Sequence, residues 1–274
     1  MRAYAAFVYL FLYGPIAIIV LFSFNAGRHA SDFQGFSLQW YGKAASNPFM
    51  MDAVQNSVII AATAATLATL FGTAAALAVQ RVRGWFRLLF DAFTYVAIMV
   101  PGIVIGISTL IAMVISFDAM NAVLAALWPG EGGPVLGFGY ASVIAAHTLF
   151  TMALVIVIVR ARIAGMDRSL IEASADLYAT PWGTFRQVTL PQILPAVIAG
   201  FLLSFTFSFD DYVIASFVYG STTTLPVYVF SSIRRGVTPE INAIGTVILA
   251  ISLVLLFGSQ LLLRRGARPA GRAA

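Results

Sequence analysis

The sequence predicts an all-α, polytopic membrane protein with six transmembrane helices. Of its 274 residues 60% are apolar and only 10% are charged, and the mean hydropathy is +0.91. Soluble globular domains carry about 25% charged residues, so an ordinary soluble domain is excluded. The apolar runs exceed about 18 residues and lack the alternation of a transmembrane β-strand, which indicates helices rather than a barrel.

Six apolar runs supply the expected spans. Each is long enough to cross a hydrocarbon core of about 30 Å at about 1.5 Å per residue. The first follows Arg2 as in a signal peptide, but its apolar run is longer than the apolar region of a typical signal peptide, so we expect an uncleaved span. The six runs are Tyr4–Phe24, Asn56–Val79, Leu89–Phe117, Ala141–Val159, Ile193–Val218 and Ile241–Leu263.

The distribution of arginine predicts the orientation. If the N-terminus is cytoplasmic, twelve Lys and Arg residues fall on the cytoplasmic side and four on the outer side. Positive residues are enriched in cytoplasmic segments, so both termini and residues 160–192 are expected in the cytoplasm. The net charge of +5 therefore reports orientation and does not indicate nucleic-acid binding. No linker divides the chain, which predicts one transmembrane domain over residues 1–274 with a disordered cytoplasmic tail at 264–274.

Small residues and a proline mark the second and third spans. Alanine and threonine recur at every fourth position of the second span, which lets helices approach closely in lipid. Pro101 and the pair Gly102 and Gly106 lie inside the third span, which we interpret as one kinked packing helix. The row in the second span is Ala61, Ala65, Thr69 and Thr73.

Residues 160–192 form a polar interruption between the fourth and fifth spans. Asp167 is placed to cap a short amphipathic helix over Arg168–Leu177 by accepting from free backbone N–H groups. Thr180 followed by Pro181 repeats such a start signal. The interruption is therefore expected to fold as a helical hairpin across the cytoplasmic face.

The second piece of this hairpin is expected to run through Phe185 to Leu190. Pro191 and Pro195 then close it, because proline interrupts the hydrogen bonds of a helix. On physical grounds two interpretations of the hairpin stay open. Its arginines can meet lipid phosphates at the membrane surface, or the hairpin can dock onto a soluble partner.

The spacing within the hairpin resembles the EAA signature of permease subunits in ATP-binding-cassette (ABC) importers. That signature reads EAA, three residues, Gly, nine residues, I, any residue, LP; here Ser174, Tyr178 and Val188 replace its second alanine, its glycine and its isoleucine. The resemblance implies a type I ABC importer permease fold (MetI-like), with residues 160–192 as the coupling hairpin seated on an ATPase subunit. It implies a coupling role for Arg168, Glu172, Ala173, Ser174, Asp176, Tyr178, Pro181, Leu190 and Pro191.

Tyr178 is the departure with a physical consequence. If the turn at the signature glycine needs a positive φ, a tyrosine there costs about 1–2 kcal/mol. Either the turn has another shape or the surface that it meets has adapted to the side chain.

Beyond the hairpin, the whole chain is similar to spermidine and putrescine permease subunits of the PotC and PotI kind. The likeness is carried by residues 204–220, by Leu225 and Pro226, and by the run that begins at Arg234. It implies a heterodimer with a second permease subunit, two cytoplasmic ATPase subunits that bind ATP and Mg, and an extracytoplasmic substrate-binding protein. It also implies a multi-pass protein of the bacterial inner membrane, where lipid surrounds the spans, and polyamines or a related small cationic solute as cargo.

Asp210 and Asp211 are carboxylates in the outer half of the fifth span, where charge is costly and normally faces the bundle interior or a watery cavity. On a continuous helix they point about 100° apart, so one is expected to line the path while the other pairs internally, with Arg234 and Arg235 as the candidate partners. Which one lines the path stays open. Aromatic faces for cation–π contacts are expected at i, i+4 and i+7, from Phe205, Phe209 and Tyr212.

The segment Gly220–Asn242 is too short to cross twice and too apolar for a plain loop. We expect an interfacial or re-entrant helix on the outer side. The outer-gate residues assigned to it are Leu225, Pro226, Arg234 and Arg235. His147, in the fourth span, is interpreted as a hydrogen-bonded packing residue rather than a proton carrier.

Missing motifs narrow the function. Lys43 lacks the upstream glycine and the following Ser or Thr of a nucleotide-binding loop, so ATP must be hydrolysed by another chain. With no cysteine, no H-E-x-x-H and two histidines in different segments, neither a metal site nor an enzyme is expected. Two alternatives stay open: a permease of the same class for another solute, such as an aminophosphonate or an opine, and an ATP-independent secondary transporter or channel.

Overall fold

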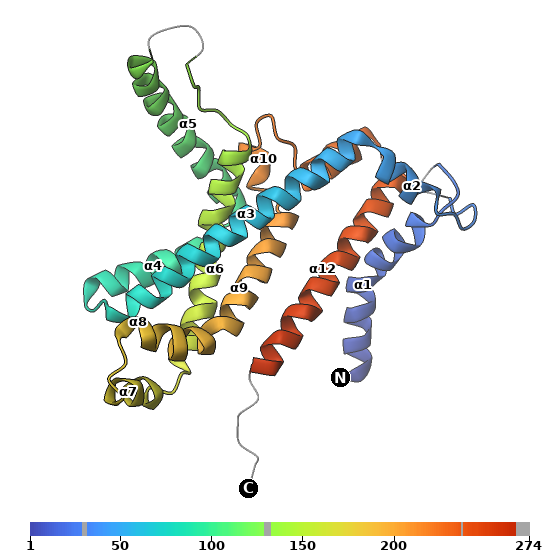
Figure 1. Ribbon diagram of the computed structural model, residues 1–274. Helices are drawn as coiled ribbons and strands as arrows, with labels where there is room; N and C mark the ends of the chain where they lie inside the picture. The colour runs from blue at the N-terminus through green and yellow to red at the C-terminus, as the bar shows by residue number, and fades with distance from the viewer. Residues whose placement is uncertain (29–31, 129–132, 237, 267–274) are drawn as a thin grey trace. The chain divides into compact units, whose positions relative to one another are not determined.

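The computed structural model describes residues 1–28, 32–128, 133–236 and 238–266 (Figure 1). Within these ranges the chain is helical, and its extended backbone pairs only at an isolated bridge between Asn25 and Phe36. The chain forms two compact units. The first contains Met1–Ser57 and Thr223–Val254, and the second is built on Val58–Thr222.

The first unit joins the N-terminal helices to the C-terminal part of the chain. Asn47 Nδ2 donates to Tyr228 Oη at 3.2 Å and to Glu240 Oε1 at 2.9 Å. Ser57 Oγ accepts from the Leu225 N–H at 2.8 Å. These bonds hold the start of α11 against the start of α3. The helices of this unit are α1 (Arg2–Ser23), α2 (Gln39–Ser46), the beginning of α3 (Pro48–Ala78), α11 (Leu225–Arg235) and most of α12 (Pro239–Gly266).

The second unit is organised around α6 (Tyr140–Ala164), which packs along α9 (Leu190–Asp210) and contacts α4, α5 and α10 as well. Its central position explains why many of its apolar residues are buried. The other elements, after the body of α3, are η1 (Val79–Arg81), α4 (Trp85–Met99), α5 (Gly102–Leu127), α7 (Ser169–Asp176), α8 (Pro181–Thr184), η2 (Phe185–Thr189) and α10 (Ala215–Val218).

Small residues let α3 approach α6 closely, as the sequence predicts. Ala61 and Ala65 are fully buried. A Cβ atom on Gly72 would lie 2.9 Å from Val155 Cβ and 3.1 Å from the Met152 carbonyl oxygen. Contacts this short leave room only for glycine, so the two helices pack backbone against side chain at this level.

In the part of the chain that the structure describes, five helices are long and apolar enough to cross a membrane, which confirms the polytopic, all-α prediction. They are Tyr4–Ser23, Pro48–Arg81, Gly102–Leu127, Tyr140–Ala164 and Pro181–Asp210. The sixth expected span corresponds to α12, of which Pro239–Val254 is the shorter apolar stretch. Because α12 continues to Gly266, the first residues of the expected tail are helical, and residues 267–274 lie outside the described part of the chain.

The prediction of one kinked helix over Leu89–Phe117 is wrong. α4 ends at Met99, Val100 and Pro101 are extended, with ψ of 132° and 136°, and α5 begins at Gly102. The residue before a proline is disfavoured in the helical region and proline has no N–H to donate, so the chain breaks here. Only α5 keeps the length of a span.

Candidate functional site

The first leg of the hairpin is α7, which begins one residue later than predicted, at Ser169, with Asp167 bonded to its first residue. Asp167 Oδ1 accepts from the Ser169 N–H at 2.9 Å. Hydrogen bonds from the Ser169 side chain, and then from its backbone, hold the pKa of the Asp167 carboxyl below its ordinary value. The lowered pKa means that this carboxylate stabilises the helix start at neutral pH, and that the stabilisation is lost as the pH falls through that pKa.

The turn after α7 places Tyr178 in the left-handed region, with φ of 57°. The Tyr178 N–H donates to the Ala175 carbonyl at 2.9 Å, and the Ala179 N–H donates to the Ser174 carbonyl at 3.1 Å. This pair of bonds is a Schellman motif, whose left-handed position usually holds glycine. Every other described residue with positive φ is a glycine. The turn therefore keeps the shape that a glycine favours, and Tyr178 carries a strain of about 1–2 kcal/mol.

The second leg begins as predicted but does not end as predicted. Thr180 Oγ1 accepts from the Gly183 N–H at 3.1 Å, with Pro181 as the first residue of α8. Pro191 and Pro195 do not close this leg, because α8, η2 and α9 run on as one helical stretch, Pro181–Asp210. η2 is a π-turn that ends at Thr189, two residues before Pro191, and such a wider turn accommodates a residue that cannot donate an N–H.

Side chains hold the two legs and the base of the hairpin together. Ser174 Oγ and Thr184 Oγ1 share a hydrogen bond of 2.9 Å, a link that the alanine of the signature could not form. At the base, Arg162 Nε donates to the Gln192 carbonyl at 2.8 Å. The hairpin is thus closed at its base and bonded across its legs.

Much of the surface of the hairpin is exposed, and part of it is apolar. Leu177, Tyr178 and Trp182 are 82%, 96% and 69% exposed. Of the predicted coupling residues, Ser174 and Leu190 are half-buried, while the exposed ones are Arg168, Glu172, Ala173, Asp176, Tyr178, Pro181 and Pro191. Exposed large apolar side chains beside charged ones are typical of a surface that meets another protein.

The two adjacent carboxylates lie at a helix end rather than on a continuous helix. The expected span Ile193–Val218 is broken, because α9 ends at Asp210, Asp211 is extended with ψ of 120°, and α10 begins at Ala215. Asp211 Oδ2 accepts from the Ala215 N–H at 2.9 Å and so caps this next short helix. We call residues 210–215 the acidic turn. Because the helix ends between the two carboxylates, the predicted angle of about 100° between them does not apply.

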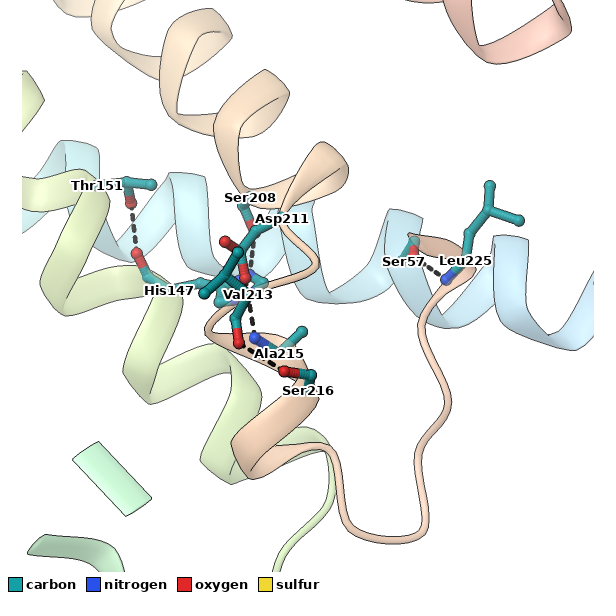
Figure 2. A network of polar contacts seen from close by, with 9 residues as sticks. All are labelled: Ser57, His147, Thr151, Ser208, Asp211, Val213, Ala215, Ser216 and Leu225. Carbon is teal, nitrogen blue, oxygen red and sulfur yellow. Dashed lines mark hydrogen bonds and ion pairs between the residues drawn. The ribbon is translucent and has the colours of Figure 1, made fainter. Parts of the chain in front are cut away.

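His147 connects α6 to the acidic turn (Figure 2). Its Nε2 lies 3.3 Å from Asp211 Oδ2, within ion-pair distance. Its Nδ1 shares a hydrogen bond of 2.7 Å with Ser208 Oγ, and the side chain is 1% exposed. The prediction of a hydrogen-bonded packing residue is confirmed. His147 is also the partner of Asp211, in the place that the sequence suggested for Arg234 or Arg235.

Asp210 has the opposite environment. It is the last residue of α9 and is exposed, whereas Asp211 is half-buried. Sequence reasoning left open which of the two lines the path. In the described structure, Asp211 is engaged with protein groups and Asp210 is the accessible carboxylate.

The predicted row of aromatic faces is also interrupted. Phe205 and Phe209 stack on each other with ring centroids 5.9 Å apart and planes 12° apart. Phe209 is 8% exposed, so its ring has little free face. Tyr212 lies beyond the end of α9 and so does not continue the i, i+4, i+7 pattern. Phe205, which is half-buried, is the aromatic residue of this set that keeps both helical placement and partial exposure.

The outer-gate residues lie on α11, in the first unit. Leu225 is 1% exposed and Pro226 is half-buried, at the first turn of the helix. Arg234 lies over the Phe230 ring, with its guanidinium carbon 5.0 Å from the ring centroid. A helix within Gly220–Asn242 is confirmed, whereas its interfacial or re-entrant placement stays a prediction. The side chain of Arg235 lies outside what the structure describes.

One ion pair was missed by sequence reasoning. Arg160, at the end of α6, pairs through Nη1 with Asp91 Oδ1 on α4. The side chains of Arg160 and Asp91 are only 22% and 27% exposed. A signal was present, because Asp91 lay inside a run assigned to the membrane, where a carboxylate needs a cationic partner. Within the described residues no group of His, Cys, Asp or Glu could hold a metal ion.

Family comparison accounts for this combination of helices and hairpin. Residues 68–268 match the family described as "binding-protein-dependent transport system inner membrane component". The chain belongs to this family. It is therefore a transport permease, and the structural prediction drawn from the hairpin signature is confirmed.

Relatives named for polyamine transport are similar to this permease over most of its length. The putrescine transport system permease protein PotI of Escherichia coli strain K12 is 41% identical over 249 residues, covering 90% of this chain and 84% of PotI. The spermidine/putrescine transport system permease protein PotC of Haemophilus influenzae is 38% identical over 265 residues, covering 96% of each chain. The resemblance to the spermidine and putrescine permeases is thereby confirmed.

Solved structures share the fold of the permease. A chain of a bacterial ABC transporter involved in the import of the acidic polysaccharide alginate has a TM-score of 0.71 at 14% identity, covering 96% of this chain and 93% of that one. A chain of an amino acid ABC transporter has a TM-score of 0.57 at 18% identity, covering 82% and 98%. The fold is that of type I ABC importer permeases, and identities this low speak to the fold alone.

Proposed function

We propose that this permease is the membrane subunit of an ATP-driven importer of polyamines such as spermidine and putrescine, or of a closely related small cationic solute. The proposal rests on the different surroundings of the two carboxylates in the acidic turn. Asp211 is held by His147 and the Ala215 N–H, while Asp210 is exposed at the end of a membrane-spanning helix. A carboxylate kept at such a costly place is suited to attract an ammonium group. The names of PotI and PotC support the same cargo class.

The hairpin is the proposed coupling element. Its exposed tip, with Leu177, Tyr178 and Trp182, offers an apolar surface for a cytoplasmic ATPase subunit. Two such subunits bind ATP with Mg, and their closure moves the hairpin. Because Pro181–Asp210 is one helical stretch, a displacement at the tip reaches Asp210 through a single element. The 21 residues of α9 alone span about 30 Å at about 1.5 Å per residue.

The remaining parts of the assembly follow from the same scheme. A second permease subunit pairs with this one, and the cavity between the two alternates between the cytoplasmic and outer sides. A substrate-binding protein delivers the solute at the outer side, where we place the start of α11 with Leu225 and Pro226. The twelve-to-four distribution of Lys and Arg supports both termini in the cytoplasm of a bacterial inner membrane.

The test is transport by the complete complex in lipid vesicles. The permease is reconstituted with its partner permease, ATPase and binding protein, and uptake of radiolabelled putrescine and spermidine is measured together with ATP hydrolysis. We expect uptake that requires ATP and that excess unlabelled polyamine inhibits. Asp210→Asn should reduce uptake roughly tenfold, while Asp210→Glu, which keeps the charge, should retain most of it.

Three results would contradict parts of the proposal. A binding protein that binds no polyamine, but binds an aminophosphonate or an opine, would overturn the cargo and leave the permease unaffected. Uptake driven by an ion gradient without ATP would favour a secondary transporter. Unchanged uptake in Asp210→Asn would remove this carboxylate from the path.

A further inference from the structure

We propose that His147 is a positioning residue for the acidic turn: by holding Asp211 inside the second unit, it keeps Asp210 turned outward. The inference rests on the proposed function for the role of Asp210 in transport, but the placement itself depends only on this chain. His147 touches no solute in this scheme. It acts through Asp211, from α6 to the end of α9.

The first support is the way His147 is fixed. Its Nδ1 is bonded to Ser208 Oγ at 2.7 Å, and Nε2 lies 3.3 Å from Asp211 Oδ2. One imidazole thus contacts α9 on both sides of its end, at Ser208 and Asp211 (Figure 2). In the tautomer in which Nδ1 accepts from the serine hydroxyl, Nε2 is the protonated nitrogen and lies at ion-pair distance from the carboxylate. The side chain is 1% exposed, so water does not compete for these contacts.

The second support is that the chain after the acidic turn is held at its far end too. Ser142 Oγ of α6 donates to the Val218 carbonyl of α10 at 2.7 Å. On the other side, a Cβ atom on Gly106 of α5 would lie 2.5 Å from Phe217 Cδ2. α10 is therefore tightly placed against α5 and α6. A change in the turn must be absorbed between Ser208 and Ala215, where His147 is bonded.

The expected effect of losing His147 follows from charge burial. Without its partner, Asp211 is a half-buried carboxylate that loses its cationic or donor neighbour, and such a group turns toward water. Asp211 follows directly on Asp210 with an extended backbone at the end of α9, so an outward turn of Asp211 changes the backbone that also aims residue 210 and withdraws it from its exposed position. His147 thus decides which of two neighbouring carboxylates is accessible.

The experiment uses the cysteine-free chain. The Asp210→Cys variant is reconstituted with its partner subunits. The rate at which a membrane-impermeant, cationic methanethiosulfonate labels the introduced thiol is then measured. A second substitution, His147→Asn, keeps an amide at the position of Nδ1 but does not reach Asp211. We expect it to slow labelling roughly tenfold. His147→Gln places its amide at the position of Nε2 and should retain the parental rate within about twofold.

Thr151→Val is the matched control. Thr151 lies one turn along α6, is fully buried and bonds only to the His147 carbonyl among the contacts described, so its loss leaves Asp211 paired. Its labelling rate should equal that of the parent. If His147→Asn yields no folded complex, Asp211→Asn in the same cysteine background tests the same contact and should also slow labelling.

Specific outcomes would overturn the proposal. An unchanged rate in His147→Asn would show that Asp210 is presented without His147, and equal slowing in Thr151→Val would show general loosening of α6. Because labelling needs no transported solute, these results do not depend on the cargo. Failure of polyamine uptake alone would instead contradict the proposed function and leave the positioning role in place.

Discussion

At the scale of single residues, Tyr178 stands where the backbone favours glycine. Its φ of 57° is supported by the two bonds of the Schellman motif, and its side chain is 96% exposed, so packing within this chain does not offset the strain. Tyr178→Gly should stabilise the hairpin by about 1 kcal/mol. Amide hydrogen exchange of α7 should slow accordingly.

The control for Tyr178 is its neighbour. Ala179 has no positive φ, so Ala179→Gly should not stabilise the hairpin and should speed exchange slightly. If Tyr178→Gly also speeds exchange, the strain assigned to this position does not exist. A loss of coupled transport despite a more stable hairpin would show that the exposed ring contacts the ATPase.

Substitutions of Asp210 and Asp211 should affect the stability of the protein to different extents. Asp211→Asn weakens the contact with His147 and the cap of α10, and should lower the free energy of unfolding by about 1–3 kcal/mol. Asp210→Asn removes an exposed charge and should change it by less than about 0.5 kcal/mol. Thermal unfolding of the purified complex measures both. Equal destabilisation by the two substitutions would contradict the division between them.

At the scale of elements, the Asp91–Arg160 pair links α4 to the C-terminal end of α6. Asp91→Asn leaves a half-buried guanidinium without its carboxylate and should cost about 1–2 kcal/mol, allowing for partial solvent screening. Arg87→Gln is the matched control. Arg87 is 52% exposed and its Nε lies 4.0 Å from Asp91 Oδ2, so its loss should cost less than about 0.5 kcal/mol. Thermal unfolding should rank the two variants in this order.

The contact between α3 and α6 depends on Gly72. Gly72→Ala places a methyl group 2.9 Å from Val155 Cβ and should destabilise the protein by about 1–3 kcal/mol. Gly245→Ala, on α12, meets no atom within 4 Å and should be neutral or slightly stabilising. The two midpoints of thermal unfolding give the comparison. A harmless Gly72→Ala would mean that the helices are less closely packed than described.

At the scale of the whole molecule, coupling is expected to run from the hairpin to the acidic turn through the single stretch Pro181–Asp210. Glu172 lies exposed on α7 and is not a support of the fold. Glu172→Arg reverses its charge and should uncouple ATP hydrolysis from uptake in reconstituted vesicles, with little change in stability. The ratio of solute imported to ATP hydrolysed is the measurement. An unchanged ratio would contradict the assigned role of the hairpin.

Much of the hairpin could be predicted because its signals are local. Asp167 caps a residue two positions away, and Thr180 caps one three positions away, so the chain supplies both partners within a single turn. The length of the apolar runs likewise predicted a polytopic helical protein, since only helices of that length satisfy their backbone in lipid. The spacing of the signature residues led to the family.

The predictions of helix ends were wrong where a distant residue or a local break in the backbone decides how the helix ends. Pro101 inside an apolar run predicts a kink, but the extended conformation of Val100 divides the span in two. Pro191 predicts the end of a helix, but the π-turn before it lets the helix continue. Sequence patterns show that such stretches are apolar, but they do not show whether one helix continues through them without a break.

The sequence by itself determined the membrane class, the hairpin with its caps and the presence of two adjacent carboxylates. The tertiary structure alone decided that Asp211 is held inside and Asp210 is exposed. It did so because the partners of charged groups come from far along the chain: His147 of α6 holds Asp211 beyond the end of α9, and Arg160 pairs with Asp91, 69 residues away. Buried charge must find a partner, and only the folded chain shows which one is within reach.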